Sequence, residues 1–192
     1  ISNEHDRMHC ERLVNEAILE LTHHISAPIQ LNVPMLDTEL SKDVAPELPE
    51  VKVIRRYGKE DIPQIDIDKK NILIVVGENR GIDDASIIEF AASTNAVIYV
   101  NHLSNMNNSY TIHGNLMLTC ISQEEFDRLF CPDILITIGG QTGDYPLYHK
   151  LAESQKKYEH WRISAKGDVV DTYDHLTKTF ECSIKDFFTI LK

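Results

Sequence analysis

Two stretches built largely of consecutive aliphatic residues, 71–76 and 133–138, dominate the hydrophobic pattern of the chain. Each ends in a glycine turn, at Gly77 and at 139–143, and residues that favour a helix follow. Uninterrupted apolar runs are typical of strands that are covered on both faces of a parallel sheet. The pattern predicts two strand–turn–helix units of a doubly wound α/β sheet, with both turns at its ligand edge.

Hydrophobic spacing and turn residues predict the other elements of the chain. A helix is expected over 6–24, and a short strand over 29–33 is bounded by prolines. Ser122, followed three residues later by an acid, is typical of a helix start. The remaining expected helices are 82–93, 144–156 and 183–191, and the remaining expected strands are 52–57, 96–100, 158–164, 169–171 and 179–182.

The segment 36–50 has the composition of a linker, because it is acidic and contains Pro46 and Pro49. We therefore divide the chain into a helix and strand of one domain (1–35), this linker, and an α/β domain (51–192). The first residue is not Met, and the N-terminus has neither the basic nor the apolar region of a signal peptide. A segment from the middle of a longer protein fits these features.

Composition excludes several classes of partner. The formal net charge of −11 disfavours nucleic acids and anionic membranes. No apolar run approaches the roughly 20 residues that span a bilayer. The four cysteines form no C-x-x-C pair, which favours reduced thiols and a cytoplasmic protein.

The glycine turns match no complete nucleotide-binding motif. The sequence Gly-Gly-Gln-Thr-Gly at 139–143 lacks one glycine of G-x-G-x-x-G, and Asn101 stands where a ribose-binding acid is expected. Asp144 at one helix start, and Asp83 and Asp84 at the other, would repel a diphosphate. A P-loop is excluded because no turn ends in G-K-[ST]. A module that binds FAD or NAD on these turns remains an alternative.

Catalytic and metal-binding motifs give no assignment, so we predict no catalytic, cofactor-binding or metal-binding residue. His5 and His9 have a metal-binding spacing but no evident third ligand. The loop 101–108 follows a predicted strand and is either a ligand loop or an Asn-rich turn. The residues expected at the ligand edge or at an active-site wall are Gly77, Asn79, Ser104, Asn105, Gly140, Gln141, Thr142 and Tyr145.

The order of elements and four local patterns resemble the thiamine-diphosphate-dependent enzymes. Residues 27–34, Ala-Pro-Ile-Gln-Leu-Asn-Val-Pro, are similar to the "G-P-V-H-I-N-V-P" strand that ends the pyrimidine-binding domain of that family. Residues 101–106, 134–140 and 159–171 resemble patterns of its branch in menaquinone biosynthesis, "D-x-L-S-x-L" and "E-x-W-x-V-D…G…D" among them. The resemblance implies that 51–192 is the Rossmann-like central domain, with a mostly parallel sheet.

The resemblance also implies an activity for a full-length protein. Such an enzyme uses thiamine diphosphate and Mg²⁺, decarboxylates 2-oxoglutarate and adds the product to isochorismate. The "G-D-G…N" motif that binds this cofactor is absent here, so the fragment is expected to be inactive alone. Its expected partners are other domains of the same chain, within a homodimer or homotetramer.

The chain also departs from the pattern of this family. Tyr145 stands where the family often has a Lys, Asp144 adds a negative charge, and Ser164 replaces an Asp. Another thiamine-diphosphate enzyme, such as an acetolactate-synthase-like protein, therefore remains open. A regulatory domain whose loop 101–108 binds a pathway product is a further possibility.

Overall fold

The computed structural model describes residues 3–33, 50–81 and 83–191. The chain divides into two compact units, 1–54 and 55–192. The predicted linker 36–50 lies outside the described residues except for its last position, Glu50. No helix in the described ranges is long and apolar enough to cross a membrane.

Among its described residues the first unit contains one helix, α1 (Glu4–Glu20), whose N-terminus is capped by the side chain of Asn3. The predicted helix over 6–24 is thus shifted towards the N-terminus. The predicted strand over 29–33 does not form: these residues are irregular and exposed. A strand needs a hydrogen-bonded neighbour, and no described segment pairs with this one.

Asn15 of α1 explains why the predicted strand 52–57 starts late. Its side-chain amide donates to the carbonyl of Lys52 at 2.8 Å, and its side-chain oxygen accepts from the amide of Ile54 at 2.8 Å. The backbone of 52–54 is therefore paired with a side chain. The strand that forms, β1, covers Arg55–Gly58 and lies at an edge of the sheet.

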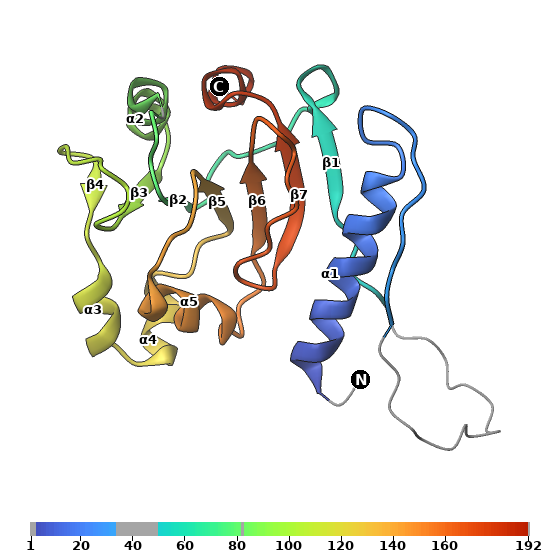
Figure 1. The fold of residues 1–192 in the computed structure, drawn as a ribbon. Coiled ribbons are helices and arrows are strands. Elements are labelled where there is room, and N and C mark those ends of the chain that lie inside the picture. The colour runs from blue at the N-terminus through green and yellow to red at the C-terminus, as the bar shows by residue number, and fades with distance from the viewer. Residues whose placement is uncertain (1–2, 34–49, 82, 192) are drawn as a thin grey trace. The chain divides into compact units, whose positions relative to one another are not determined.

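The second unit is built on one sheet of seven parallel strands in the order β1-β7-β6-β5-β2-β3-β4 (Figure 1). This confirms the predicted doubly wound α/β fold. The winding direction reverses between β2 and β5, and this switch point is where such sheets place ligands. The strands are β2 (Ile72–Val76), β3 (Ala96–Val100), β4 (Thr111–Ile112), β5 (Ile134–Ile138), β6 (Glu159–Ile163) and β7 (Leu176–Glu181).

Helices accompany the strands of this sheet. They are α2 (Asp84–Ser93), α3 (Asn115–Cys120), α4 (Gln123–Leu129), α5 (Tyr145–Ala152) and α6 (Ile184–Ile190), and a short 3-10 helix covers Lys59–Asp61. The predicted cap of α4 forms a complete capping box between Ser122 and Glu125. The extended piece predicted at 169–171 is irregular, and the sequence pattern missed β4 and α3 because each is too short to show a period.

Two apolar layers explain why the sequences of β2 and β5 are almost entirely hydrophobic. Alternate residues such as Ile74 and Ile136 pack in one cluster with Phe90 of α2 and Phe188 of α6. The apolar residues between them, Leu73, Val75 and Leu135, belong to a second cluster with side chains of α3, α4 and α5, which are Leu118, Phe126, Leu147 and Leu151. Every residue of β2 and β5 is buried. Helices therefore cover the two central strands on both faces.

Candidate functional site

The turns after β2 and β5 contact each other directly at the switch point of the sheet. The amide of Glu78 donates to the carbonyl of Gln141 at 2.9 Å, and the amide of Gly140 donates to the carbonyl of Glu78 at 2.9 Å. A Cβ atom at Gly77 would lie 2.2 Å from the carbonyl oxygen of Gly140. Gly77 is therefore required for this close approach of two backbones.

This contact decides what the glycine turns can hold. A dinucleotide fold presents free amides of its first turn to a pyrophosphate. Here the amides of Glu78 and Gly140 already bond to the opposite turn, and the amide of Gly77 donates to Ile138 at 2.9 Å. The two glycine turns therefore form closed corners between strand and helix. The alternative of FAD or NAD on these turns gains no support from the geometry.

Asp144 has a structural role that differs from the expected one. It was expected to add negative charge at the ligand edge, but it is 5% exposed. Its carboxylate caps α5 by accepting from the amide of Leu147 at 3.1 Å, and it also accepts from the hydroxyl of Tyr99 at 2.7 Å and from the side chain of Asn115 at 3.1 Å. Burial, and then the bond to Asp144, raise the pKa of Tyr99 well above its usual range. The carboxylate thus joins α5 to β3 and α3.

The loop 101–108 is tied to the same turns. Ser104 is fully buried, and its hydroxyl donates to the carbonyl of Val76 at 2.5 Å. The side chain of Asn101 donates to the carbonyl of Thr142. The amide of Asn79 donates to the carbonyl of Leu103 at 3.1 Å. Many hydrogen-bonding groups of this loop are therefore already bonded to other parts of the protein.

The sequence-predicted edge residues separate into two groups in the structure. Gly140, Gln141, Thr142 and Tyr145 line a cavity of about 450 Å³ beside the β5 turn. Tyr145 is 76% exposed at this site. Asn105 is exposed on its loop with φ +44°, and neither it nor Asn79 lines this cavity.

A buried polar chain lies beneath this first cavity. Thr137, which contributes to the cavity lining, is 2.9 Å from the Nε2 atom of His160, whose Nδ1 atom is 3.5 Å from Asp171. The residue types are those of a hydroxyl nucleophile, a base and an orienting acid. However, Thr137 is 4% exposed and His160 is fully buried. These three buried side chains therefore connect the sheet to the 169–175 segment, and Thr137 is not an accessible nucleophile.

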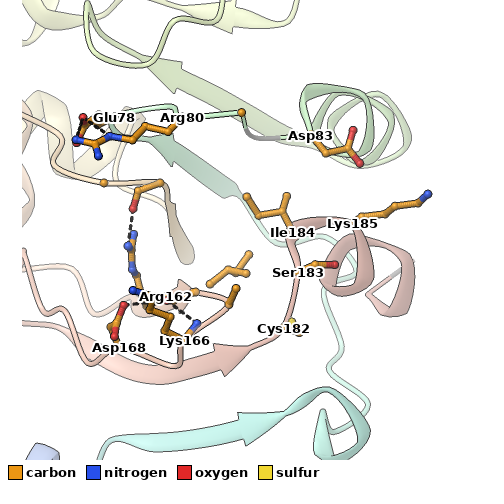
Figure 2. A pocket seen from close by; sticks show the side chains of 16 residues that line it. Glu78, Arg80, Asp83, Arg162, Lys166, Asp168, Cys182, Ser183, Ile184 and Lys185 are labelled. Atoms are coloured by element: carbon orange, nitrogen blue, oxygen red, sulfur yellow. Dashed lines mark hydrogen bonds and ion pairs between the residues drawn. The ribbon is translucent and has the colours of Figure 1, made fainter.

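A second cavity, of about 870 Å³, lies against the other side of the β5 turn (Figure 2). It is bordered by the turns that follow β2, β5 and β6 and by the start of α6. Its charged lining residues are Glu78, Arg80, Asp83, Arg162, Lys166, Asp168 and Lys185. Gly140 contributes to both cavities, whereas Gln141, Thr142 and Tyr145 line only the smaller one.

Arg162 of β6 is the functional candidate that sequence reasoning missed. It lines both cavities, and one terminal nitrogen donates to the carbonyl of Gly139 (Figure 2). Burial lowers the pKa of its guanidinium, and the charge of Asp168 opposes this shift. A signal was present, because the sequence places this arginine between Trp161 and Ile163 within the predicted strand 158–164. The pattern 159–171 was used only for the resemblance.

Cys182 also lines the larger cavity, but it is not an activated nucleophile. The thiol is 7% exposed. Burial raises its pKa to about 11. The reactive form of a cysteine is the thiolate, which is a minor species for such a group at neutral pH.

The parallel doubly wound sheet, with its closed turns at the switch point, defines this unit as a Rossmann-like α/β domain. No family model matches the chain. Curated proteins named 2-succinyl-5-enolpyruvyl-6-hydroxy-3-cyclohexene-1-carboxylate synthase are similar to it over most of its length. The protein from Bacteroides thetaiotaomicron is 31% identical across 97% of the chain, and so is that from Phocaeicola vulgatus. The protein from Bacteroides fragilis is 30% identical across 90%.

These similarities confirm the resemblance seen in the sequence. The chain is similar to a part of this synthase, in agreement with a domain of a thiamine-diphosphate-dependent enzyme. It spans about a third of the length of the curated relatives, 35% for two of them and 33% for the third.

Proposed function

We propose that the chain is the central domain of a thiamine-diphosphate-dependent enzyme that decarboxylates a 2-oxoacid and transfers the product to an acceptor. The observation that carries this proposal is the similarity to the synthase from B. thetaiotaomicron across 97% of the chain. The seven-stranded parallel sheet agrees with the fold expected for that domain. By analogy with the relatives, the reaction joins 2-oxoglutarate to isochorismate in menaquinone biosynthesis.

The residues of this chain do not fit the cofactor itself. No "G-D-G…N" segment occurs in the sequence, and the amides of the β2 and β5 turns are engaged with each other. Thiamine diphosphate and Mg²⁺ would therefore be held by other parts of a full-length protein, and residues 1–192 alone would be inactive. The chain's own contribution is structural: the segment 140–145 forms a wall beside the cavity of about 450 Å³.

The proposed partners follow from the same analogy. Other domains of the same chain would pack on this one, within a homodimer or homotetramer. The four cysteines are free thiols in the structure, which supports a reducing compartment such as the cytoplasm.

Tyr145 bears on the choice of substrate. It is 76% exposed beside the smaller cavity, and it stands where the menaquinone branch often has a lysine. A neutral phenol attracts an anionic acceptor less strongly than an ammonium group does. An acetolactate-synthase-like reaction, with a less highly charged acceptor, is therefore the second candidate function.

The test is an assay of the full-length protein with thiamine diphosphate and Mg²⁺. Release of CO₂ is measured with 2-oxoglutarate and with pyruvate, each with and without isochorismate. We expect one of the 2-oxoacids to be decarboxylated, and the preferred pair to separate the two candidates. If neither acid is decarboxylated under any of these conditions, the proposal is wrong.

A pair of matched variants tests the role of Tyr145. Tyr145→Lys should raise kcat/KM for isochorismate by about fivefold, the effect of one favourable surface charge of about 1 kcal/mol. The control is Tyr110→Lys, because Tyr110 is also exposed, at 46%, but lines neither cavity. Equal effects of the two substitutions would argue against an active-site wall at 140–145.

A further inference from the structure

We propose that Arg162 anchors a binding site for a small oxyanion, a carboxylate or phosphate group, in the cavity of about 870 Å³ between the β2, β5 and β6 turns and α6. This inference concerns binding by residues of this chain alone. It does not depend on the cofactor or on the reaction proposed above.

The first argument is the incomplete hydrogen bonding of Arg162. A guanidinium carries five N–H donors in a rigid fork. One terminal nitrogen donates to the carbonyl of Gly139, but the Nε atom is buried and has no hydrogen-bond partner among the described residues. No ion pair of Arg162 with a carboxylate lies within 4.0 Å in this part of the chain. A buried, under-satisfied cation is costly, and a bound anion would offset that cost.

The second argument is the charge that remains in the cavity. Its carboxylates have other roles: Glu78 pairs with Arg80 at 2.7 Å, and Asp83 caps α2 by accepting from Ser86. Asp168 accepts from the hydroxyl of Ser164 at 3.2 Å.

Three cations line the same cavity without a carboxylate partner within ion-pair distance among the described residues. They are Arg162, Lys166 and Lys185. The lining has four cations and three carboxylates, so in a protein with a formal net charge of −11 this recess carries a small excess of positive charge. Such a recess raises the local concentration of an anion.

The third argument is the shape of the site. A cavity of about 870 Å³ is within the range of small-molecule sites, about 300–1,000 Å³. The neighbouring turns are closed by their mutual hydrogen bonds, so a pyrophosphate cannot be held on their amides. Side-chain cations, rather than backbone donors, therefore provide the recognition. The anion belongs to a compact ligand with one or two charged groups.

The experiment measures binding of two named probes, inorganic phosphate and succinate, to the full-length protein. Each is titrated at constant ionic strength against a chloride reference, by calorimetry and by the shift of the thermal midpoint. Succinate reports a carboxylate ligand and phosphate reports a phosphate ligand, so the two arms distinguish the sources of the anion. We expect saturable binding of at least one probe.

Variants locate the site. Arg162→Gln should weaken binding about tenfold or more, as expected for the loss of a charge-assisted hydrogen bond. Lys166→Gln and Lys185→Gln remove exposed cations, preserve the fold and should each weaken binding by about two- to fivefold. Arg128→Gln is the matched control, because Arg128 is an exposed arginine of α4 outside this cavity.

Each outcome bears on the proposal. Selective loss of binding in the cavity variants supports it, and so does loss in the two lysine variants if Arg162→Gln fails to fold. Unchanged affinity in Arg162→Gln, or in both lysine variants, overturns it. Absence of saturable binding of either probe up to about 10 mM also overturns it. Binding without any 2-oxoacid decarboxylation would leave this site in place and refute only the proposed enzymatic function.

Discussion

The hydroxyl of Tyr99, at the end of β3, donates a 2.7 Å hydrogen bond to the carboxylate of Asp144, which caps α5. Asp144 is 5% exposed and Tyr99 is 3% exposed, so the bond is shielded from water. It fixes the start of the helix that follows the β5 turn. The position of Tyr145 at the smaller cavity depends on this buried contact.

Replacement of Asp144 by Ala should therefore destabilise the protein by about 2–4 kcal/mol. It removes a helix cap, worth about 1 kcal/mol, and leaves the Tyr99 hydroxyl and the Asn115 amide without their partner. Urea unfolding can be followed through Trp161, the sole tryptophan, which is 1% exposed. Ser183→Ala, which removes the exposed cap of α6, is the control and should cost about 1 kcal/mol. Equal losses of unfolding free energy in the two variants would show that the hydrogen bonds from Tyr99 and Asn115 add no stability beyond the helix cap.

Gly77→Ala should open the contact between the two turns. The added Cβ would lie 2.2 Å from the Gly140 carbonyl oxygen, and backbone atoms cannot move away without breaking the hydrogen bonds of Glu78. We expect a loss of about 3 kcal/mol in local stability, measured as faster hydrogen exchange in peptides from 71–81 and 134–144.

Gly58→Ala is the control for this experiment. Its Cβ would meet only the end of the Asp61 side chain, at 3.3 Å, and that side chain can rotate. The change in local stability should stay below about 1 kcal/mol. The close-approach explanation fails if exchange in the β2 and β5 peptides of Gly77→Ala equals that of the unsubstituted protein.

Asp133 should make stability depend on pH on the acid side. Its carboxylate accepts from the backbone amide of Asn71 at 2.9 Å, and this bond, with smaller contributions from Lys156, lowers its pKa. Because the folded pKa lies below the unfolded value of about 3.9, the stabilisation is complete above that value. It is lost as pH falls through the folded pKa.

Asp133→Asn removes the carboxylate that provides this pH-dependent stabilisation. The difference in urea midpoint between the original protein and this variant should be largest near neutral pH and should shrink below about pH 4. Asp68→Asn, which removes one exposed carboxylate in the loop before β2, is the matched control. A constant difference for Asp133→Asn across this range would exclude the proposed linkage.

Cys182 should resist alkylation in the folded protein. With its pKa raised to about 11, roughly one thiol in a thousand is ionised at pH 8, and the side chain is 7% exposed. Mass spectrometry after brief iodoacetamide treatment should show modification of the exposed Cys120 well before Cys182. After denaturation both should react. Rapid native labelling of Cys182 would contradict its burial.

The resemblance to thiamine-diphosphate-dependent enzymes and the α/β fold could both be obtained from the sequence. The apolar runs at 72–76 and 134–138, interrupted only by Thr137, indicate strands that are covered on both faces, because only such strands need no polar side. The N-terminal helix cap at Ser122 could also be predicted, because its partner Glu125 lies within one helical turn. Local rules suffice where the interacting residues are neighbours in the chain.

Only part of the candidate site could be predicted from the sequence. The sequence placed Gly140, Gln141, Thr142 and Tyr145 at one edge, and the structure groups them around one cavity. It could not show that the β2 and β5 turns bond to each other, because their contact joins residues about 60 positions apart in sequence. Nor could it show which way the side chain of Arg162 leaves β6.

The sequence by itself thus determined most strands of the sheet, the glycine turns and the family pattern, which depend on local spacing and on residue type. The tertiary structure alone decided three matters: the burial of Asp144, the closure of the crevice at the switch point, and the exposure of Arg162 to two cavities. The physical reason is that burial and hydrogen-bond satisfaction depend on distant segments. A charge in the sequence therefore carries no sign of whether it faces solvent, a partner or a ligand.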